Sequence, residues 1–168
     1  MDTTTTDEPA PVAAEPDGGE FAAFYRREHE GQVRRAFLLT GDAPTAHDVV
    51  ADAFVAVLRR WRTIEQPGPY LSRCVLNGCR DVRRIRPREQ ARPDPEAEDH
   101  ATDPVDDLAD VLAGLPFRQR AAVVLRFYGG LSQAEIADQL GCRPGTVGSL
   151  IHRALKRLRT TLELEEGR

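Results

Sequence analysis

The chain has 168 residues, of which 40% are hydrophobic and 6% aromatic, a composition that suits compact helical cores but is thin for a large sheet protein. No apolar run approaches the roughly 20 residues that cross a bilayer, and the N-terminus lacks the basic start and apolar middle of a signal peptide. The net charge of −4 conceals two basic stretches, residues 21–88 and 111–168, around an acidic one, so we expect a cytoplasmic protein, without membrane insertion, that contacts a polyanion at two places.

The N-terminal half predicts an acidic tail followed by three helices. Residues 1–20 hold six acids, no base and almost nothing to bury, which indicates disorder. Helical spacing starts at Phe21 and stops at TGDAPT, where Gly41 is expected to cap one helix and Pro44 to open the next. That second helix is expected over residues 44–61, with this buried set: Val49, Val50, Phe54, Val57, Leu58 and Trp61.

A third helix and a linker complete this half. After the loop IEQPGP, helical spacing runs from Tyr70 to about Arg86, so a first helical domain is expected over residues 21–86. Residues 87–106 are rich in proline and acids and nearly devoid of apolar side chains. They predict a flexible acidic linker, because proline and self-repelling charge keep a chain extended.

The C-terminal half contains the strongest local motif of the chain. Helices are expected around Leu108–Leu115 and over Phe117–Tyr128, within a second domain over residues 107–164. The segment LSQAEIADQLGCRPGTVGSLIHRALKRL then predicts a short helix, a tight turn and a longer helix. Ser132 with Glu135 forms a capping box, and Gly141 permits a left-handed turn.

The last helix is expected to divide into a buried face and a polar face. The apolar face should consist of Val147, Ile151, Ala154, Leu155 and Leu158. The outward face, preceded by Arg143, should present Thr146, Ser149, His152, Arg153 and Lys156. A short helix, a turn and a longer helix with a polar and basic face is the geometry of a DNA-binding helix-turn-helix.

Two further patterns lie in the first domain. The helix over residues 70–86 should carry Arg73, Asn77, Arg80 and Arg84 on one face, with Arg83 beside them. Asparagine can bond a base edge while arginines hold phosphates, although a solvated charged helix would show the same composition. Asp48 and Asp52 share a face of the preceding helix, and on a basic domain they suggest a protein partner in addition to DNA.

Several functions therefore compete. A stand-alone helix-turn-helix regulator accounts for the second domain but gives no reason for the acidic pair or the Asn77 helix. A protein adaptor would make the basic faces incidental. An enzyme, a cofactor and a metal site are not expected, because Cys74, Cys79 and Cys142 form no metal-binding spacing and no nucleophile–base pair or glycine-rich phosphate loop occurs.

A family resemblance separates these hypotheses. FYRREHEGQVRRAFLLTGDAPTAHDVVADAF, LRRW and YLSRCVLNGCRDVRR resemble domain 2 of the extracytoplasmic-function (ECF) sigma factors of the sigma-70 family. LPFRQRAAVVLRFYGGLSQAEIADQLGCRPGTVGSLIHRALKRLR resembles their domain 4. The two segments together are most similar to the actinobacterial sigma-E-like group. The resemblance covers roughly residues 21–164 and implies an all-α chain of two small helical domains, a domain 2 bundle and a domain 4 helix-turn-helix.

The resemblance also implies partners and roles. Asp48 and Asp52 would bind the β′ clamp of core RNA polymerase, the Asn77 helix would bind and help open the promoter −10 element, and the last helix would bind the −35 element. Domain 4 would dock on the β flap. An anti-sigma factor is a partner that such proteins commonly have, although no feature here requires one. The acidic linker would either imitate nucleic acid in the polymerase cleft or act only as a spacer.

Two motifs depart from the family pattern. The family usually has AEDLVQEAF where this chain has AHDVVADAF, so His47 replaces an acid and Ala51 a glutamine. It commonly has GTVKSR or GTVRSR where this chain has GTVGSL, so Gly148 and Leu150 replace basic residues. We expect altered clamp affinity and weaker or altered −35 recognition.

Overall fold

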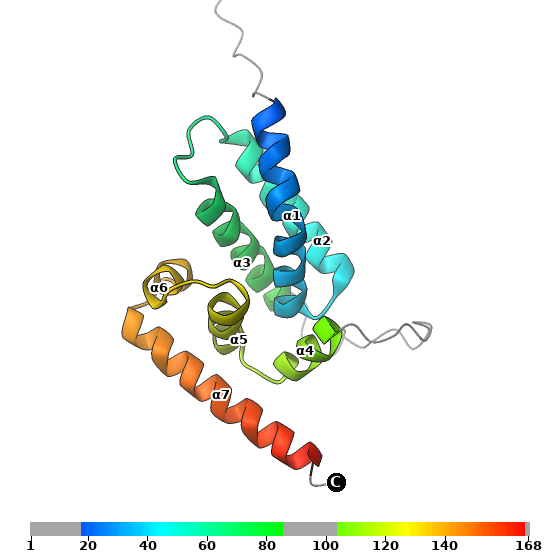
Figure 1. Ribbon diagram of the computed structural model, residues 1–168, viewed down its shortest axis with the longest axis vertical. Helices are drawn as coiled ribbons and strands as arrows, with labels where there is room; N and C mark the ends of the chain where they lie inside the picture. The colour runs from blue at the N-terminus through cyan, green and yellow to red at the C-terminus, as the bar shows by residue number, and fades with distance from the viewer. Residues whose placement is uncertain (1–17, 86–103, 167–168) are drawn as a thin grey trace, which may run out of the picture.

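The computed structural model describes residues 18–85 and 104–166, and all regular structure in these two ranges is helical (Figure 1). Three helices form the N-terminal bundle: α1 (Gly18–Thr40), α2 (Ala43–Arg59) and α3 (Pro67–Ile85). The C-terminal bundle contains α4 (Pro104–Ala113), α5 (Phe117–Val123), the π-helix η2 (Val124–Tyr128), α6 (Gln133–Leu140) and α7 (Pro144–Glu166). The expected all-α class is confirmed.

Local capping chemistry explains where α1 ends and α2 begins. Gly41 has φ +76°, a left-handed conformation that lets the chain leave α1 without a side-chain penalty. Asp42 then caps α2, because its Oδ2 accepts a hydrogen bond from the Thr45 backbone N–H at 2.8 Å. The turn expected at TGDAPT is confirmed, with Asp42 as the cap and Pro44 in the first turn.

An aromatic cluster joins the start of α1 to the end of α2 and the residues that follow it. The Trp61 ring lies 5.3 Å from the Phe21 ring and 5.2 Å from the Phe24 ring, centroid to centroid. Phe54 of α2 packs edge-on against Phe21. These geometries are those that aromatic pairs favour, and they confirm the expected core position of Trp61.

A close approach between α2 and α3 depends on Gly78. A Cβ built on Gly78 would lie 2.7 Å from Cγ1 of Val49, closer than real carbon atoms approach. Val49 is itself buried and β-branched, so its side chain has little freedom to move aside. The glycine therefore sets the spacing of the helix that carries Asn77 against the helix that carries Asp48.

Gly78→Ala is expected to lower the free energy of unfolding by about 1–2 kcal/mol, because overpacking costs more than the gain in helix propensity returns. Urea unfolding followed by the fluorescence of Trp61, the single tryptophan, measures this change. Gly31→Ala is the matched control, since a Cβ there meets nothing within 4 Å. That control should gain up to about 1 kcal/mol. Equal stabilisation by both substitutions would contradict the packing role of Gly78.

The helix-turn-helix forms as its sequence predicts. Ser132 Oγ accepts from the Glu135 N–H at 3.3 Å, and the Glu135 carboxylate accepts from the Ser132 N–H at 2.8 Å, which completes the capping box. The Ser132 hydroxyl also donates to Oε2 of Glu135 at 2.7 Å, and this bond, followed by the one from the Ser132 N–H, holds the pKa of Glu135 below its usual range. Gly141 ends α6 in the left-handed conformation at φ +61°. Pro144 begins α7, where a missing N–H costs nothing.

The structure corrects several sequence expectations. Periodicity predicts that Leu58 and Leu155 are buried, but they are 40% and 43% exposed. Each side chain lies on a side of its helix that no other element covers within the described residues. In the segment IEQPGP the last three residues form the first turn of α3, because proline is compatible with helix starts. The expected helix over Phe117–Tyr128 changes to a π turn at Val124.

Domain boundaries also shift at their edges. Helix α1 already begins at Gly18, within the tail expected over residues 1–20, and α4 begins at Pro104, within the linker expected over residues 87–106. The rest of the expected tail and linker, residues 1–17 and 87–103, lies outside the described residues. The two bundles are also not independent, since their buried apolar side chains form one continuous cluster and α1 packs against α4.

Candidate nucleic-acid interface

Helix α3 carries a polar face on the surface of the N-terminal bundle. Arg73, Arg80 and Arg84 are exposed, and Asn77 between them is half-buried. Arg80 Nη2 donates to Oδ1 of Asn77 at 3.1 Å, a bond that orients the amide through its oxygen and does not use its NH₂ group. Four of the five predicted residues of α3 thus lie on one face, with an arginine positioning the asparagine.

Arg83, the fifth predicted residue, leaves this face. Its guanidinium carbon lies 5.9 Å from the centroid of the Phe117 ring, the first residue of α5. A cation over an aromatic face is attracted by the ring quadrupole. In this conformation Arg83 contacts the C-terminal bundle.

Helix α7, with Arg143 directly before it, carries the second group of predicted residues. Arg143, Thr146, Ser149 and His152 are exposed around its N-terminal half, while Val147 and Ala154 are buried on the opposite side. Ser149 Oγ donates to the Gly145 carbonyl at 3.2 Å, which leaves the oxygen lone pairs available as acceptors. The N-terminal half of α7 therefore has the polar surface that a recognition helix requires.

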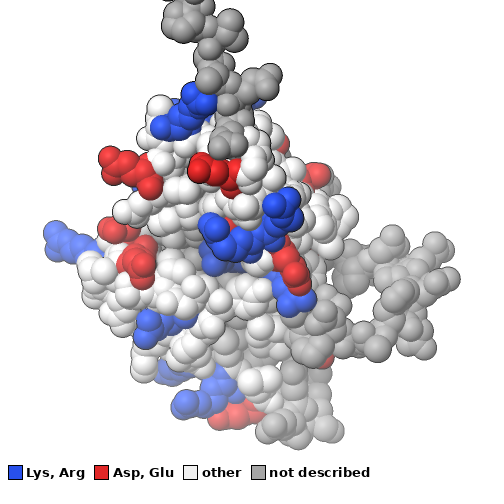
Figure 2. All heavy atoms as spheres, turned by 45° about the horizontal axis from the view of Figure 1, so that its top comes forward, with Lys and Arg blue, Asp and Glu red and all other residues white. Residues whose placement is uncertain are grey.

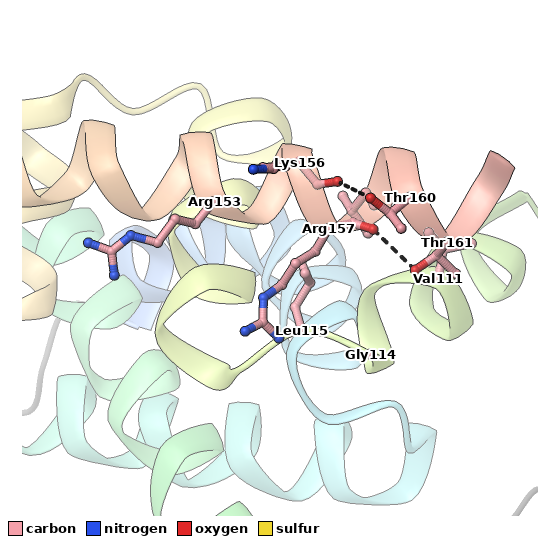
Figure 3. A pocket seen from close by; sticks show the side chains of 9 residues that line it. Val111, Gly114, Leu115, Arg153, Lys156, Arg157, Thr160 and Thr161 are labelled. Atoms are coloured by element: carbon pink, nitrogen blue, oxygen red, sulfur yellow. Dashed lines mark hydrogen bonds between the residues drawn. The ribbon is translucent and has the colours of Figure 1, made fainter. Parts of the chain in front are cut away.

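Arg153 and Lys156, further along α7, border a groove of about 490 Å³ between α7 and the end of α4. Figure 3 shows Arg153 and Arg157 extending from the same side of α7, with Arg157 next to Leu115. The −35 residues predicted from the sequence are thus continuous along one helix. They end beside a basic groove with an apolar floor.

The acidic pair lies on the exposed side of α2. Asp48 and Asp52 are both solvent-exposed and one helical turn apart, and Val55, 45% exposed, follows them on the same side. His47 lies beside the pair, and its ring is 6.3 Å from that of His29 on α1. On the face shown in Figure 2, basic and acidic side chains lie beside one another on a largely uncharged surface. This face therefore has no single large patch of one charge, and individual charged side chains would contact a partner there.

Sequence reasoning missed the residues that join the two bundles. Arg120 is 2% exposed, and its guanidinium donates to the Leu39 carbonyl at 3.0 Å and to the Ala113 carbonyl at 2.6 Å. Arg35 Nη1 donates to Ser72 Oγ at 2.7 Å, and Ser72 donates to Oε1 of Gln139 at 3.0 Å. The only signal in the sequence is a charged residue, Arg120, at the start of the apolar run AAVVL.

Within residues 18–85 and 104–166, no cluster of His, Cys, Asp and Glu side chains is arranged to hold a metal ion. No helix in those ranges is long and apolar enough to span a membrane. Burial raises the pKa of the Cys79 thiol to about 12, and this side chain packs in the core.

Comparison with known proteins identifies the family. Residues 106–158 match the model of sigma-70, region 4. The RNA polymerase sigma-E factor of Streptomyces coelicolor is 37% identical over 152 residues, covering 85% of this chain and 86% of that protein. The ECF RNA polymerase sigma factor SigL of Mycobacterium tuberculosis is 33% identical, covering 90% and 93%. The chain is an ECF sigma factor.

A solved structure agrees with this assignment. CnrH in complex with the cytosolic domain of CnrY superposes with a TM-score of 0.70 at 26% identity, over 90% of this sigma factor and 93% of that chain. As an alternative sigma factor, the protein directs transcription initiation. The resemblance inferred from its two sets of motifs is confirmed.

Gly148 stands where the family commonly has a basic residue, and the structure shows its surroundings on α7. A Cβ on Gly148 would meet only the Gln133 side chain, at the ordinary contact distance of 3.8 Å. The site therefore accommodates a side chain, and the missing basic residue is not enforced by packing.

Gly148→Arg is expected to tighten binding to a −35 duplex and to steepen the slope of log K against log salt by about 0.9, the effect of one added phosphate contact. Gly148→Ala is the control. It should raise stability by about 1 kcal/mol through helix propensity and leave the salt slope unchanged. Titrations of holoenzyme with duplex DNA at several salt concentrations measure both. An unchanged slope for the arginine variant would place position 148 away from DNA.

Proposed function

We propose that this ECF sigma factor binds the promoter −10 element with α3 and the −35 element with α7, while Asp48 and Asp52 on α2 bind the β′ clamp of core RNA polymerase. The observation that carries this proposal is the Asn77 face of α3. There, an amide positioned by Arg80 at 3.1 Å stands among exposed arginines on a helix separate from the helix-turn-helix. An amide can bond a base edge, and guanidinium groups neutralise phosphates.

The −10 half would capture unpaired bases as well as bind the backbone. Unstacking a base costs a few kcal/mol, which contacts to the extruded base and to phosphates must offset. We assign this capture to the loop before α3 and to the face of α3 that carries Asn77 and the exposed arginines. The protein would act in the cytoplasm, as a polymerase subunit without catalytic residues of its own.

An anti-sigma factor is proposed as a further partner. One solved structure with the same fold is that of a sigma factor, RpoE of Bartonella quintana, in complex with the anti-sigma factor NepR. That chain is 22% identical to this one, so the likeness supports the fold alone. The exposed apolar residues Leu58 and Phe127, the latter 65% exposed, are surfaces on which a protein partner could pack.

One experiment separates the proposal from its rivals. The purified chain is mixed with core RNA polymerase of Streptomyces coelicolor, the source of a relative 37% identical, and with a library of random promoters. We expect a holoenzyme that selects promoters with two separated elements and opens the DNA at the downstream one. DNA binding by the chain alone, without a holoenzyme, would indicate a stand-alone regulator. Binding to neither would indicate an adaptor.

A further inference from the structure

A polar cleft of about 390 Å³ lies between α1, α3 and α6. Its charged lining residues are Glu28, Arg35, Arg73, Glu135 and Asp138. Small-molecule sites in proteins commonly have volumes of about 300–1,000 Å³. The cleft therefore has the size of a site for a small, polar ligand, and none of the contacts proposed above for DNA or polymerase uses it as a pocket.

Arg35 is a half-buried cation that lacks an acidic partner. Its Nη1 donates to Ser72 Oγ at 2.7 Å and to Gln32 Oε1 at 3.4 Å, two neutral oxygens on side chains that are 5% and 4% exposed. Among residues 18–85 and 104–166 no carboxylate forms an ion pair with its guanidinium, and its buried Nε has no hydrogen-bond partner there. A cation removed from water without a counter-charge is costly, so this position favours a ligand that supplies one.

The surroundings of Arg35 agree with this reading. Burial lowers the pKa of Arg35 from its ordinary value, and the electrostatic influence of Glu28 and Tyr128 opposes this only in part. The guanidinium is also closely packed, because a Cβ built on Gly129 would lie 3.3 Å from its Nη2. A side chain held by packing and by two hydrogen bonds loses little further freedom when a ligand binds.

Two of the three carboxylates of the cleft already accept hydrogen bonds. Glu28 Oε1 accepts from Arg27 Nε at 3.0 Å, and Glu135 Oε2 accepts from the N–H and the hydroxyl of Ser132. Asp138 is exposed and makes no hydrogen bond or ion pair within the part of the chain that the structure describes. Asp138 is therefore the carboxylate best able to accept from a ligand.

The balance of charge selects the class of ligand. The lining has more carboxylates than arginines, so it repels a ligand that carries only negative charge. A ligand that carries only positive charge would leave Arg35 without a counter-charge. A zwitterion meets both conditions, because its carboxylate accepts from a guanidinium and its ammonium group donates to a carboxylate.

From this arrangement we propose that the cleft binds a free amino acid, with the carboxylate of the ligand on Arg35 and its ammonium group on Asp138. The neutral amides of Gln66 and Gln139 also line the cleft and favour an amino acid with a polar side chain. The site stands apart from the roles proposed for α3 and α7, since neither Arg35 nor Asp138 is among the residues assigned to DNA or polymerase.

The test follows thermal unfolding of the full chain by the fluorescence of Trp61, with a panel of free L-amino acids at equal ionic strength. Sodium acetate, sodium phosphate and methylammonium chloride are the comparators that carry charge of one sign. We expect at least one polar amino acid to raise the Tm by about 5–10 °C at roughly 100 times its Kd, while the comparators at the same concentration do not. No shift with any amino acid, or an equal shift with acetate or phosphate, would overturn the proposal.

Arg35→Met tests the carboxylate side of the site. Isothermal titration should show binding of the active amino acid weakened on the order of tenfold or more, the effect of losing hydrogen bonds to a charged group. Arg34→Met is the matched control, because Arg34 is adjacent in sequence, exposed and paired with Glu30 outside the cleft. Without ligand, Arg35→Met should unfold at the same or a higher temperature than wild type, since it removes an uncompensated charge. A lower Tm would show that the protein itself compensates Arg35.

Asp138→Asn tests the ammonium side at an exposed position, where the substitution leaves the fold intact. Binding of the amino acid should again weaken on the order of tenfold, through loss of a charged acceptor. Asp110→Asn, at an exposed position of α4 outside the cleft, is its control and should bind as wild type does. Wild-type affinity in either Arg35→Met or Asp138→Asn would overturn the proposed orientation of the ligand. These measurements involve neither DNA nor polymerase, so they are decided separately from the −10 and clamp assignments.

Discussion

Asn77→Ala is expected to slow opening of the −10 region on the order of tenfold or more, while initial binding to the closed promoter changes by less than about threefold. The substitution removes the amide that Arg80 orients at 3.1 Å. A base-edge contact of this kind is worth about 1–3 kcal/mol, and it forms only once the base is unpaired. Permanganate reactivity of unpaired thymines measures opening, and filter binding on ice measures the closed complex.

Arg84→Ala provides the contrast for this prediction. Arg84 is exposed on the same face and would contact phosphate, which is present in both closed and open DNA. Its loss should therefore weaken both steps similarly and reduce the salt dependence. Equal losses in binding and opening for Asn77→Ala would show that the asparagine is also only a backbone contact.

Asp52→Arg is expected to weaken holoenzyme formation by about a hundredfold or more. Asp52 is exposed on α2 beside Asp48, and an acidic pair of this kind favours a partner surface of opposite charge. Truncating one partner of a buried interfacial charge pair costs about 2–5 kcal/mol, and reversing its charge adds repulsion. Fluorescence anisotropy of the labelled sigma factor titrated with core polymerase measures this loss.

Glu30→Arg is the control for Asp52→Arg, since it makes the same change in charge at an exposed position of α1. It breaks only a surface ion pair with Arg34 at 3.0 Å, worth about 0.3–0.5 kcal/mol. Holoenzyme affinity should stay near that of wild type. If both substitutions weaken assembly alike, net charge rather than the acidic pair sets the affinity.

Short-range signals predict most of the local structure correctly. The capping box of Ser132 and Glu135, the left-handed Gly141 and the position of Pro144 at the start of α7 all involve groups within a few residues of each other. Such signals act in nearly any tertiary context, because the hydrogen bonds and backbone conformations concerned are local. The same holds for the face that places Asn77 with Arg80.

Two expectations that depend on distant elements are wrong, and one close contact could not be predicted. Leu58 and Leu155 fit the apolar periodicity of their helices, but burial needs a second element at that position, and periodicity does not say where one ends. Helical spacing places Gly78 on the apolar side of α3, but its tight contact with Val49 cannot be seen from one helix alone.

The helices, the capping box of α6 and the polar faces of α3 and α7 could be predicted from the sequence, since each depends on residues close together in the chain. The single core shared by the two bundles, and the Arg120 contacts that bridge them, are visible only in the folded structure. Leu39 and Arg120 are 81 residues apart, and Arg120 bonds a backbone carbonyl that any residue would offer. A bond to a backbone carbonyl places no requirement on the side chain at position 39. The sequence therefore does not reveal this contact, and the packing of the two bundles becomes visible only in the folded structure.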